Sequence, residues 1–378
     1  MKKNMIKLGD VATYINGYAF KPEDRGEVGL PIIRIQDLTG NAYDLGFYNG
    51  DYPKRIEIND GDVLISWSAS LGVYVWNRGR ALLNQHIFKV EFDKVNIDKS
   101  YFVYAVRQKL AEMAMKTHGA TMKHIVKKDF EETLIPYPSQ KKQIEIGTNL
   151  DKIANIIAAR KQQLELLDEL VKARFVELFG DAIYNDKGWE NDTVEKLCKE
   201  IYGGGTPSKS HPEYYEDGDI PWVSSKDMKT DVLTDSQIKI NQLGVDNSTA
   251  RMVPINSVIM VIRSGILKHT LPVAINAVPI TVNQDLKVFI PNKRVLTRFL
   301  AIQFKMHEKD ILSGVRAVTA DNIEFNSLKQ RELIVPPIEL QQEYVTFLEQ
   351  IDKSKVAIQK SLDETQILFD SLMQKYFG

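Results

Sequence analysis

The sequence predicts an α/β (α+β) fold, in which two domains are joined by a long antiparallel two-helix coiled coil as an internal pseudo-two-fold repeat. The first observation behind this prediction is that the chain of 378 residues repeats itself once, at a period of about 198 residues. The second is that each half begins with short β-like runs and turn signals. The third is that each half ends in about 40 residues with heptad spacing of apolar side chains. A period this long indicates a duplicated domain rather than a solenoid.

The matched segments of the repeat follow each other in the same order in both halves. They are Lys7–Asp10 with Lys196–Lys199, 30–38 with 220–228, 61–72 with 256–267, Asn84-Gln85 with Asn283-Gln284, Thr121/Ile125 with Thr319/Ile323, 134–143 with 333–342, and Phe179-Gly180 with Phe377-Gly378. The difference in residue number between matched positions changes along the first part of each half and stays nearly constant in the last third. Each half therefore has a variable front and a constant back.

The two fronts, 1–138 and 181–338, are each predicted to be a compact α/β domain. Runs rich in β-branched and aromatic residues predict strands, and Asn-Gly, Asp-Gly and Pro mark the turns between them. The predicted strands cover 63–67, 87–92, 257–262 and 286–290, and one helix is expected in each front, over 99–116 and 295–312.

The two backs, 139–180 and 339–378, are predicted to be long helices of a coiled coil. Pro138 and Ser139 form a start signal for the first helix, and Gly180 forms a stop signal. About 40 residues at ~1.5 Å rise give a rod of ~60 Å. The apolar seams comprise Ile146, Leu150, Ile153, Ile157, Leu164, Leu167, Val171 and Leu178 in the first helix, and Tyr344, Leu348, Ile351, Ile358, Leu362, Phe369, Leu372 and Tyr376 in the second.

Four polar residues interrupt these seams: Arg160, Arg174, Lys355 and Thr365. They either lie at the edge of the seam with their stems along it, or fix the register or meet a partner helix. The sequence favours the first interpretation and leaves the second open.

Composition excludes several classes of protein. With 49 Lys+Arg against 50 Asp+Glu, the net charge of −1 argues against a protein that coats nucleic acid without specificity. The single cysteine, Cys198, excludes a disulfide framework and a cysteine-only zinc site, and it is expected to be a buried small hydrophobe. The N-terminus lacks the apolar run of a signal peptide, and no stretch approaches the ~18 apolar residues of a membrane span. We expect a soluble cytoplasmic protein without a membrane partner.

No catalytic or cofactor-binding motif is found. The glycines of 203–209 lack phosphate-loop spacing, and the prolines at 135–139 and 335–339 lack the leading Asn/Asp and the aromatic residue of an adenine-methylating motif. None of the six histidines has metal-ligand spacing, and His118 and His124 are expected to be solvated loop residues. We therefore expect no metal and no cofactor bound by this chain.

The order of these segments resembles a type I restriction-modification specificity (S) subunit. The residues that carry the resemblance are KLGDVA with the Asn-Gly that follows, GGGTPSKS, EYYEDGDIPWVSSKDM, the two Asn-Gln segments and LIVPPIELQQE leading into a heptad helix. The resemblance covers both halves. Single motifs are weak, but their order, present twice with matched helices, is specific.

The resemblance implies that each front is a target recognition domain that reads one half of a bipartite, asymmetric site in double-stranded DNA. It implies that the coiled coil sets the unread spacer and that the chain is not an enzyme. It also implies two methyltransferase (M) subunits, which bind S-adenosylmethionine, and in the nuclease form two restriction (R) subunits with ATP and Mg. A ~60 Å rod spans the roughly 34–36 Å between half-sites one turn apart.

Candidate DNA-contacting residues are taken from loops that combine hydroxyl, aromatic and cationic side chains. The set is Tyr18, Lys21, Ser66, Trp67, Ser68, Ser70, Lys123 and His124 in the first front, and Thr206, Ser208, Lys209, Arg263, Ser264, Lys268, Arg316 and Thr319 in the second. Thr206, Ser208 and Lys209 suit phosphate contacts. Arg263 is the best candidate for a bidentate guanine contact, with an ion pair to a carboxylate as the equal alternative. The Asn-Gln pairs are more often structural.

Two other classes of function remain open from the sequence. One is a coiled-coil scaffold that bridges two protein-binding domains without reading DNA. The other is an enzyme with a cryptic site. No front is strongly basic and the second helix is the most acidic segment, so DNA binding would depend on local patches or on charge from partners.

Overall fold

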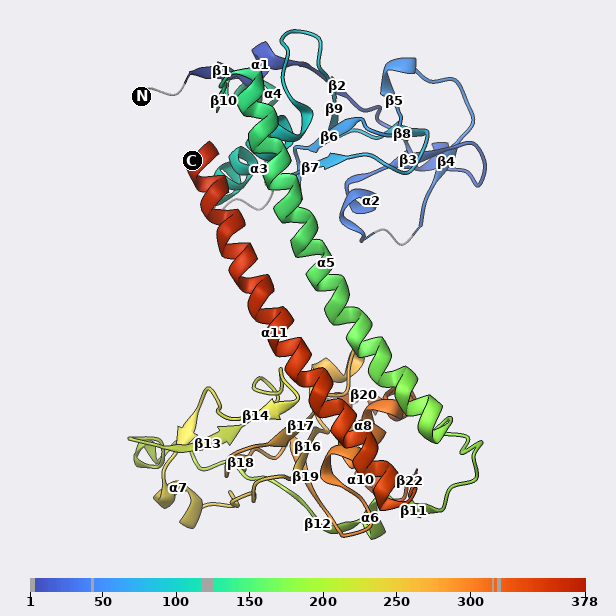
Figure 1. Ribbon diagram of the computed structural model, residues 1–378, viewed down its shortest axis with the longest axis vertical. Coiled ribbons are helices and arrows are strands. Elements are labelled where there is room, and N and C mark those ends of the chain that lie inside the picture. Colours follow the sequence, from blue (N-terminus) through green and yellow to red (C-terminus); the bar gives the residue numbers. More distant parts are fainter. Residues whose placement is uncertain (1–3, 42–43, 117–124, 315, 318–320) are drawn as a thin grey trace. The chain divides into compact units, whose positions relative to one another are not determined.

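The computed structural model describes residues 4–41, 44–116, 125–314, 316–317 and 321–378, which form two compact units (Figure 1). Unit 1 comprises 1–162 and 359–378, and unit 2 comprises 163–358. Each unit contains one front together with parts of both long helices, so the boundary falls inside the helices rather than at their ends. The predicted fold class, two α/β domains with a coiled coil, is confirmed.

Unit 1 is built on two four-stranded sheets and one strand pair. Their orders are β2-β9-β6-β7, β4-β3-β8-β5 and β1-β10. The strands are β1 (Met5–Lys7), β2 (Thr13–Asn16), β3 (Leu30–Ile33), β4 (Phe47–Tyr48), β5 (Glu57–Ile58), β6 (Val63–Ser66), β7 (Gly72–Val75), β8 (Ala81–Leu83), β9 (Ile87–Glu91) and β10 (Leu134–Pro136), and the helices are α1 (Leu8–Val11), α2 (Ile35–Thr39), α3 (Lys99–Lys116) and α4 (Lys127–Glu131).

Unit 2 repeats this frame with a five-stranded main sheet, a three-stranded second sheet and one additional strand pair. Its sheets have the orders β12-β19-β16-β17-β14 and β15-β13-β18, beside the pairs β11-β22 and β20-β21. The elements are β11 (Asn191–Thr193), α6 (Val194–Leu197), β12 (Cys198–Gly203), β13 (Ile220–Val223), β14 (Val232–Leu233), β15 (Lys239–Ile240), α7 (Gln242–Asp246), β16 (Val258–Val261), β17 (Val273–Asn276), β18 (Thr281–Val282), β19 (Leu286–Pro291), α8 (Thr297–Met306), α9 (Glu308–Ser313), β20 (Arg316–Ala317), β21 (Asp321–Asn322), α10 (Phe325–Lys329) and β22 (Glu332–Ile334).

Hydrogen bonds fix which residues of the two units are equivalent, and they correct two sequence matches. The Leu8 amide donates to Thr133 O at 2.9 Å, and the Val194 amide donates to Arg331 O at 2.9 Å. Leu8 is therefore equivalent to Val194, so the match of Lys7–Asp10 with Lys196–Lys199 was wrong by three residues, close to one helical turn. The same pairs place 134–143 opposite 332–341, one residue from the predicted match.

The helices of the two fronts differ in one respect. Helix α3 spans the predicted 99–116, whereas the helix predicted over 295–312 is two helices, α8 and α9, which meet at His307. His307 is buried, and burial lowers its pKa to about 4. Its Nε2 has no hydrogen-bond partner among the described residues.

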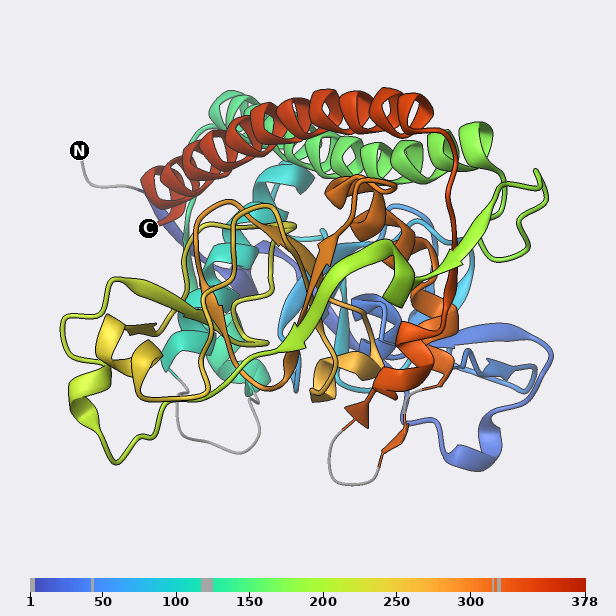
Figure 2. The same ribbon diagram turned by 90° about the horizontal axis from the view of Figure 1, so that it is seen from below.

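The two long helices, α5 (Gln140–Phe179) and α11 (Ile338–Phe377), are antiparallel within each unit (Figures 1 and 2). In unit 2, Arg174 pairs with Glu343 at 2.7 Å and Lys355 pairs with Asp168, each across the two helices. These two interruptions thus lie at the partly exposed edge of the seam and pair with a carboxylate of the other helix. Thr365 instead donates to Ser361 O of its own helix.

Each unit has its own main apolar core. In unit 1 the core includes Phe88, Phe102 and Phe377, and in unit 2 it includes Phe179, Phe299 and Tyr344. Both cores therefore include side chains from a front and from a long helix. Cys198 is buried at the start of β12, and burial raises the pKa of its thiol to about 12. Among the described helices, none combines the length and the apolar character that crossing a bilayer requires.

Candidate nucleic-acid interface

In each unit, the polar loops lie together at one end of the main sheet. In unit 1, β2 ends where β9 begins, since Asn16 pairs with Phe88, and β6 ends there too, since Ser66 pairs with Ile87. The segments 17–21, 67–71 and 84–86 therefore meet at this edge. In unit 2 the corresponding segments are 204–210, 262–272 and 283–285. We call this edge the loop end.

The long helices begin at the other end of each main sheet. The buried side chain of Gln143 accepts a hydrogen bond from the Asp98 amide at 2.9 Å and donates to Pro138 O at 2.9 Å. Gln341 does the same in unit 2, accepting from the Leu296 amide at 3.0 Å. The main sheet therefore lies between the start of a long helix and the loop end within each unit.

A glycine holds the first loop against the Asn-Gln segment in both units. A Cβ on Gly17 would overlap the carbonyl oxygen of Asn84, and one on Gly204 would overlap that of Val282. Only glycine permits this backbone approach. This close approach brings Tyr18, which follows Gly17, and Thr206, which follows Gly204 by two residues, to the Asn-Gln pair.

The first-front candidates fall into accessible and buried side chains. Tyr18 is exposed and packs edge-on against Phe20, and the Lys21 ammonium lies 3.9 Å from Glu23 in solvent. Ser70 is exposed and Ser68 is half-buried. Ser66 is fully buried and donates to Ser70 O. It is a structural residue rather than a contact residue, which corrects its inclusion in the candidate set.

Trp67 is both part of the core and part of the loop end. Its ring stacks on Phe88 with centroids 5.5 Å apart, and its Nε1 donates to Asn16 Oδ1 at 3.3 Å. The His86 ring lies against it edge-on at 4.9 Å. The ring therefore supports the loop, and its half-buried position leaves one part at the surface.

In the second front, the phosphate-contact candidates are accessible. Ser208 and Lys209 are exposed, and the Ser208 hydroxyl lies 2.7 Å from that of Ser210. Thr206 donates to Gln284 Oε1, which ties this loop to the Asn-Gln pair. Hydroxyls and an ammonium beside a glycine turn can bind a phosphodiester.

Arg263 forms the ion pair that the sequence left as one of two alternatives. Its Nε and Nη2 lie 2.7 and 2.6 Å from Asp285 Oδ1, while its side chain stays 48% exposed. Ser264 caps the short 3-10 helix Gly265–Lys268, and Lys268 lies 3.8 Å from Asp321. The guanidinium is therefore held by one edge and accessible at the other, so the ion pair and a base contact are compatible.

Four candidates cannot be placed by their side chains. Lys123, His124 and Thr319 lie outside the described residues, and of Arg316 only the backbone, paired with Asn322 in β20-β21, is described. The segments after them do reach the loop end. The Ile125 amide donates to Trp67 O, and the equivalent Ile323 amide donates to Ile262 O, each at 2.9 Å.

Sequence reasoning missed two side chains of the loop end, His86 and Asp285, and one beside it on β19, Lys287. His86 and Asp285 directly follow the Asn-Gln pairs, and this position was the available signal. Lys287 has its Nζ 4.6 Å from the centre of the Phe325 ring, and desolvation lowers its pKa. Among the described residues, no group of His, Cys, Asp and Glu has an arrangement that could hold a metal ion.

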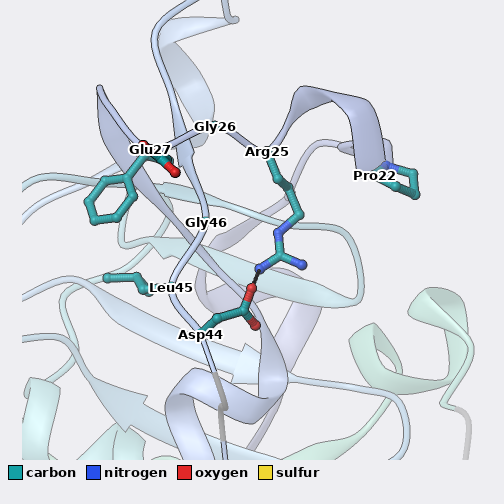
Figure 3. A pocket seen from close by; sticks show the side chains of 8 residues that line it. Pro22, Arg25, Gly26, Glu27, Asp44, Leu45 and Gly46 are labelled. Atoms are coloured by element: carbon teal, nitrogen blue, oxygen red, sulfur yellow. Dashed lines mark hydrogen bonds and ion pairs between the residues drawn. The ribbon is translucent and has the colours of Figure 1, made fainter.

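A hollow in the first front lies on the segment that follows Lys21 (Figure 3). Figure 3 shows the Arg25 guanidinium pointing to the Asp44 carboxylate, and their Nη2 and Oδ2 atoms are 2.8 Å apart. Because this cation is already paired, the hollow does not add a free positive charge to the interface.

Comparison with known proteins finds similarity along nearly all of the chain. The profile of the "Type I restriction modification DNA specificity domain" matches residues 2–167 and 186–366. Among curated proteins, the EcoR124I/EcoR124II specificity subunit of Escherichia coli is 32% identical over 225 residues, which are 58% of this chain and 54% of that protein. The match thus spans about half the length of that relative.

Two further relatives match over more of their length. The EcoBI specificity subunit of Escherichia coli is 22% identical over 98% of this chain and 83% of its own. The MjaIX specificity subunit of Methanocaldococcus jannaschii is 23% identical over 94% of this chain and 91% of its own.

Solved structures show the same fold. The type I restriction-modification S subunit from M. genitalium superposes with a TM-score of 0.63 at 13% identity, covering 100% of this chain and 96% of that one. A chain from a study of type I R-M complex assembly gives 0.58 at 14% identity, covering 100% and 99%.

Proposed function

Because the chain belongs to the type I restriction-modification DNA specificity family, we propose that it directs such a complex to DNA by reading a bipartite, asymmetric target. Each front, 1–138 and 181–338, reads one half-site through its loop end. Family membership favours this function over a scaffold that does not recognise DNA.

The observation that carries the proposal is one backbone frame with two different sets of loop side chains. Equivalent hydrogen bonds define the loop end in both units, yet Trp67 and His86 occupy it in unit 1 where Ile262 and Asp285 occupy it in unit 2. Since base readout depends on individual side chains, two such fronts suit two different half-sites.

The coiled coil serves as the spacer and as the docking region for partners. Two M subunits, which hold S-adenosylmethionine, supply adenine methylation, and two R subunits with ATP and Mg supply cleavage in the nuclease form. This chain is the non-catalytic member. Its part in the reaction is to bind DNA, through residues that include Arg263, Lys209 and Thr206.

The proposal is tested by sequencing the methylated positions in a host that expresses this chain with its M subunit. We expect one bipartite motif with a fixed spacer. Exchanging residues 1–138 for the front of another member should change one half-site and leave the other intact. Methylation without a sequence preference, or a change in both half-sites, would refute the assignment.

The spacer role has its own test. Adding four residues to α5 after Gln162 and four to α11 after Ile358 lengthens each helix by ~6 Å, and inserting in both keeps pairs such as Asp168–Lys355 in register. The spacer should grow by about one or two base pairs, at roughly 3.4 Å each, with both half-sites unchanged. An unchanged spacer would contradict the proposal.

A further inference from the structure

His86 and Asp285 occupy one position of the repeated frame. The Trp67 amide donates to His86 O at 3.2 Å, and the equivalent Ile262 amide donates to Asp285 O at 2.9 Å. Both residues directly follow an Asn-Gln pair, and β9 or β19 begins with the next residue. Their backbones therefore occupy the same place of the loop end, although His86 alone of the two has positive φ.

In unit 2 this position serves to hold Arg263. Asp285 Oδ1 accepts from Nε at 2.7 Å and lies 2.6 Å from Nη2, and its Oδ2 accepts from Asn283 Nδ2 at 3.1 Å. A carboxylate that is itself anchored fixes the direction of the guanidinium. Less rotamer entropy is then lost when the remaining N–H groups meet a ligand.

In unit 1 no cation stands in the place of Arg263, because the equivalent residue is Ser68. His86 has φ of 72°, a backbone conformation that non-glycine residues seldom adopt and that is concentrated at functional sites. Its ring lies 4.9 Å from Trp67, and its Nδ1 is buried without a partner among the described residues. The fold keeps the imidazole at the loop end and leaves its Nδ1 without a hydrogen bond to any residue that the structure describes.

We propose that His86 and Asp285 are specificity-determining residues of the two fronts, which rests on the function proposed above. The His86 imidazole contacts a base edge itself. Asp285 is a positioning residue that aims Arg263 at one. Because Nδ1 is buried, the half-buried imidazole has one ring nitrogen left for a base, whereas a guanidinium offers parallel donors. The two units therefore select different base edges from the same place in the frame.

The test in unit 1 uses substitutions that tolerate the left-handed backbone. His86→Gly and His86→Asn keep φ accessible while removing the imidazole. Methylated-site sequencing with the M subunit should show one base position of one half-site losing about tenfold of its preference, with the other half-site unchanged. Asn256→Gly is the matched control, since Asn256 also has positive φ, 61°, and precedes β16 at the end away from the loop end of unit 2.

The test in unit 2 separates positioning from contact. Arg263→Ala and Asp285→Asn should relax the same base position of the other half-site, and the double variant should relax it no further, because the two residues act as one unit. Asp285→Glu should recover part of the preference. The control is Asp235→Asn, which removes an exposed carboxylate paired with Lys239 in the same unit.

The outcomes distinguish this inference from the proposed function. If the His86→Gly variant kept the full base preference of the wild type, the role of His86 would be overturned. If Arg263→Ala and Asp285→Asn had additive effects at different base positions, the role of Asp285 would be overturned. In both cases the bipartite motif itself would still support the function. The absence of any motif in the wild type would refute the function instead.

Discussion

Both units place an aromatic ring against an ammonium group, but the two residue types occupy opposite positions of the backbone frame. In unit 1, Phe88 lies on β9 and Lys127 begins α4, with Nζ 5.9 Å from the ring centre. In unit 2, Lys287 takes the position of Phe88, and Phe325 takes that of Lys127, with Nζ 4.6 Å from the ring centre. The frame thus preserves the contact while the residues that form it change places.

This exchange gives the two loop ends different chemistry. Phe88 is fully buried and supports Trp67, so the loop end of unit 1 is built on stacked rings. Lys287 is half-buried, and near it Arg263 and Asp285 form an ion pair, so the loop end of unit 2 is built on charges. The comparison teaches that a duplicated domain can keep its strand register and still diverge at the positions that face a ligand.

Replacing the aromatic ring at Phe88 should have the largest effect on the free energy of unfolding. Phe88→Lys places an ammonium in the core and should lower the free energy of unfolding by about 4 kcal/mol. Phe88→Lys combined with Lys127→Phe reproduces the arrangement of unit 2 and should recover about 1–2 kcal/mol. Urea unfolding measures both. A double variant as unstable as the sum of its single changes would show that the frames are not interchangeable.

The close backbone approach at Gly17 and at Gly204 should contribute equally to the stability of the two units. Gly17→Ala and Gly204→Ala force backbone atoms apart and should each cost about 3 kcal/mol. Hydrogen exchange measured by mass spectrometry should show the loss confined to the unit that carries the change. Gly265→Ala is the control, because a Cβ there meets no atom within 4 Å. Equal exchange rates in wild type and Gly17→Ala would contradict this contribution to stability.

Acid should weaken unit 2 before unit 1. Burial holds the pKa of His307 at about 4, below its ordinary value of about 6.5. The unfolded chain binds the proton first, so stability falls as pH drops below about 6.5, by about 2 kcal/mol near pH 5. Unfolding of His307→Gln should depend less on pH in this range. The control is His211→Gln, an exposed histidine, and an unchanged pH profile in His307→Gln would refute the prediction.

The smallest expected effects concern the two buried glutamines. Gln143→Ala removes hydrogen bonds to the Asp98 amide and Pro138 O, and should cost about 1–2 kcal/mol. Gln341→Ala should cost slightly more, since its amide also donates to Arg294 O. Thermal unfolding measures both, and an exposed glutamine, Gln350, provides the control. A larger loss in Gln143→Ala would reverse the expected order.

Much of the fold could be predicted because it depends on periodicity. Heptad spacing predicted the long helices, and runs of β-branched residues predicted the strands β6, β9, β16 and β19. Both signals are local and repeat over many residues. The duplication then supplied the pairing of the halves, except where a short match such as Lys7-Leu8 with Lys196-Leu197 fitted a four-residue helix one turn out of register.

The interface was less predictable because it depends on which side chains meet. No local pattern reveals that Ser66 turns inward or that Arg263 meets Asp285, since each partner is fixed by strand register. The break between α8 and α9 at His307 likewise has no signal in the local sequence, which favours a continuous helix.

The division of the long helices between the units has a consequence for synthesis. Residues 359–378 belong to unit 1, and Met373 and Phe377 are part of its core. The front of unit 1 therefore receives these core residues only after all of unit 2 has been translated. Unit 2, which ends at residue 358, can complete its core earlier. Of the two fronts, the one that is translated earlier thus belongs to the unit that is completed later, and its core stays incomplete while unit 2 is made.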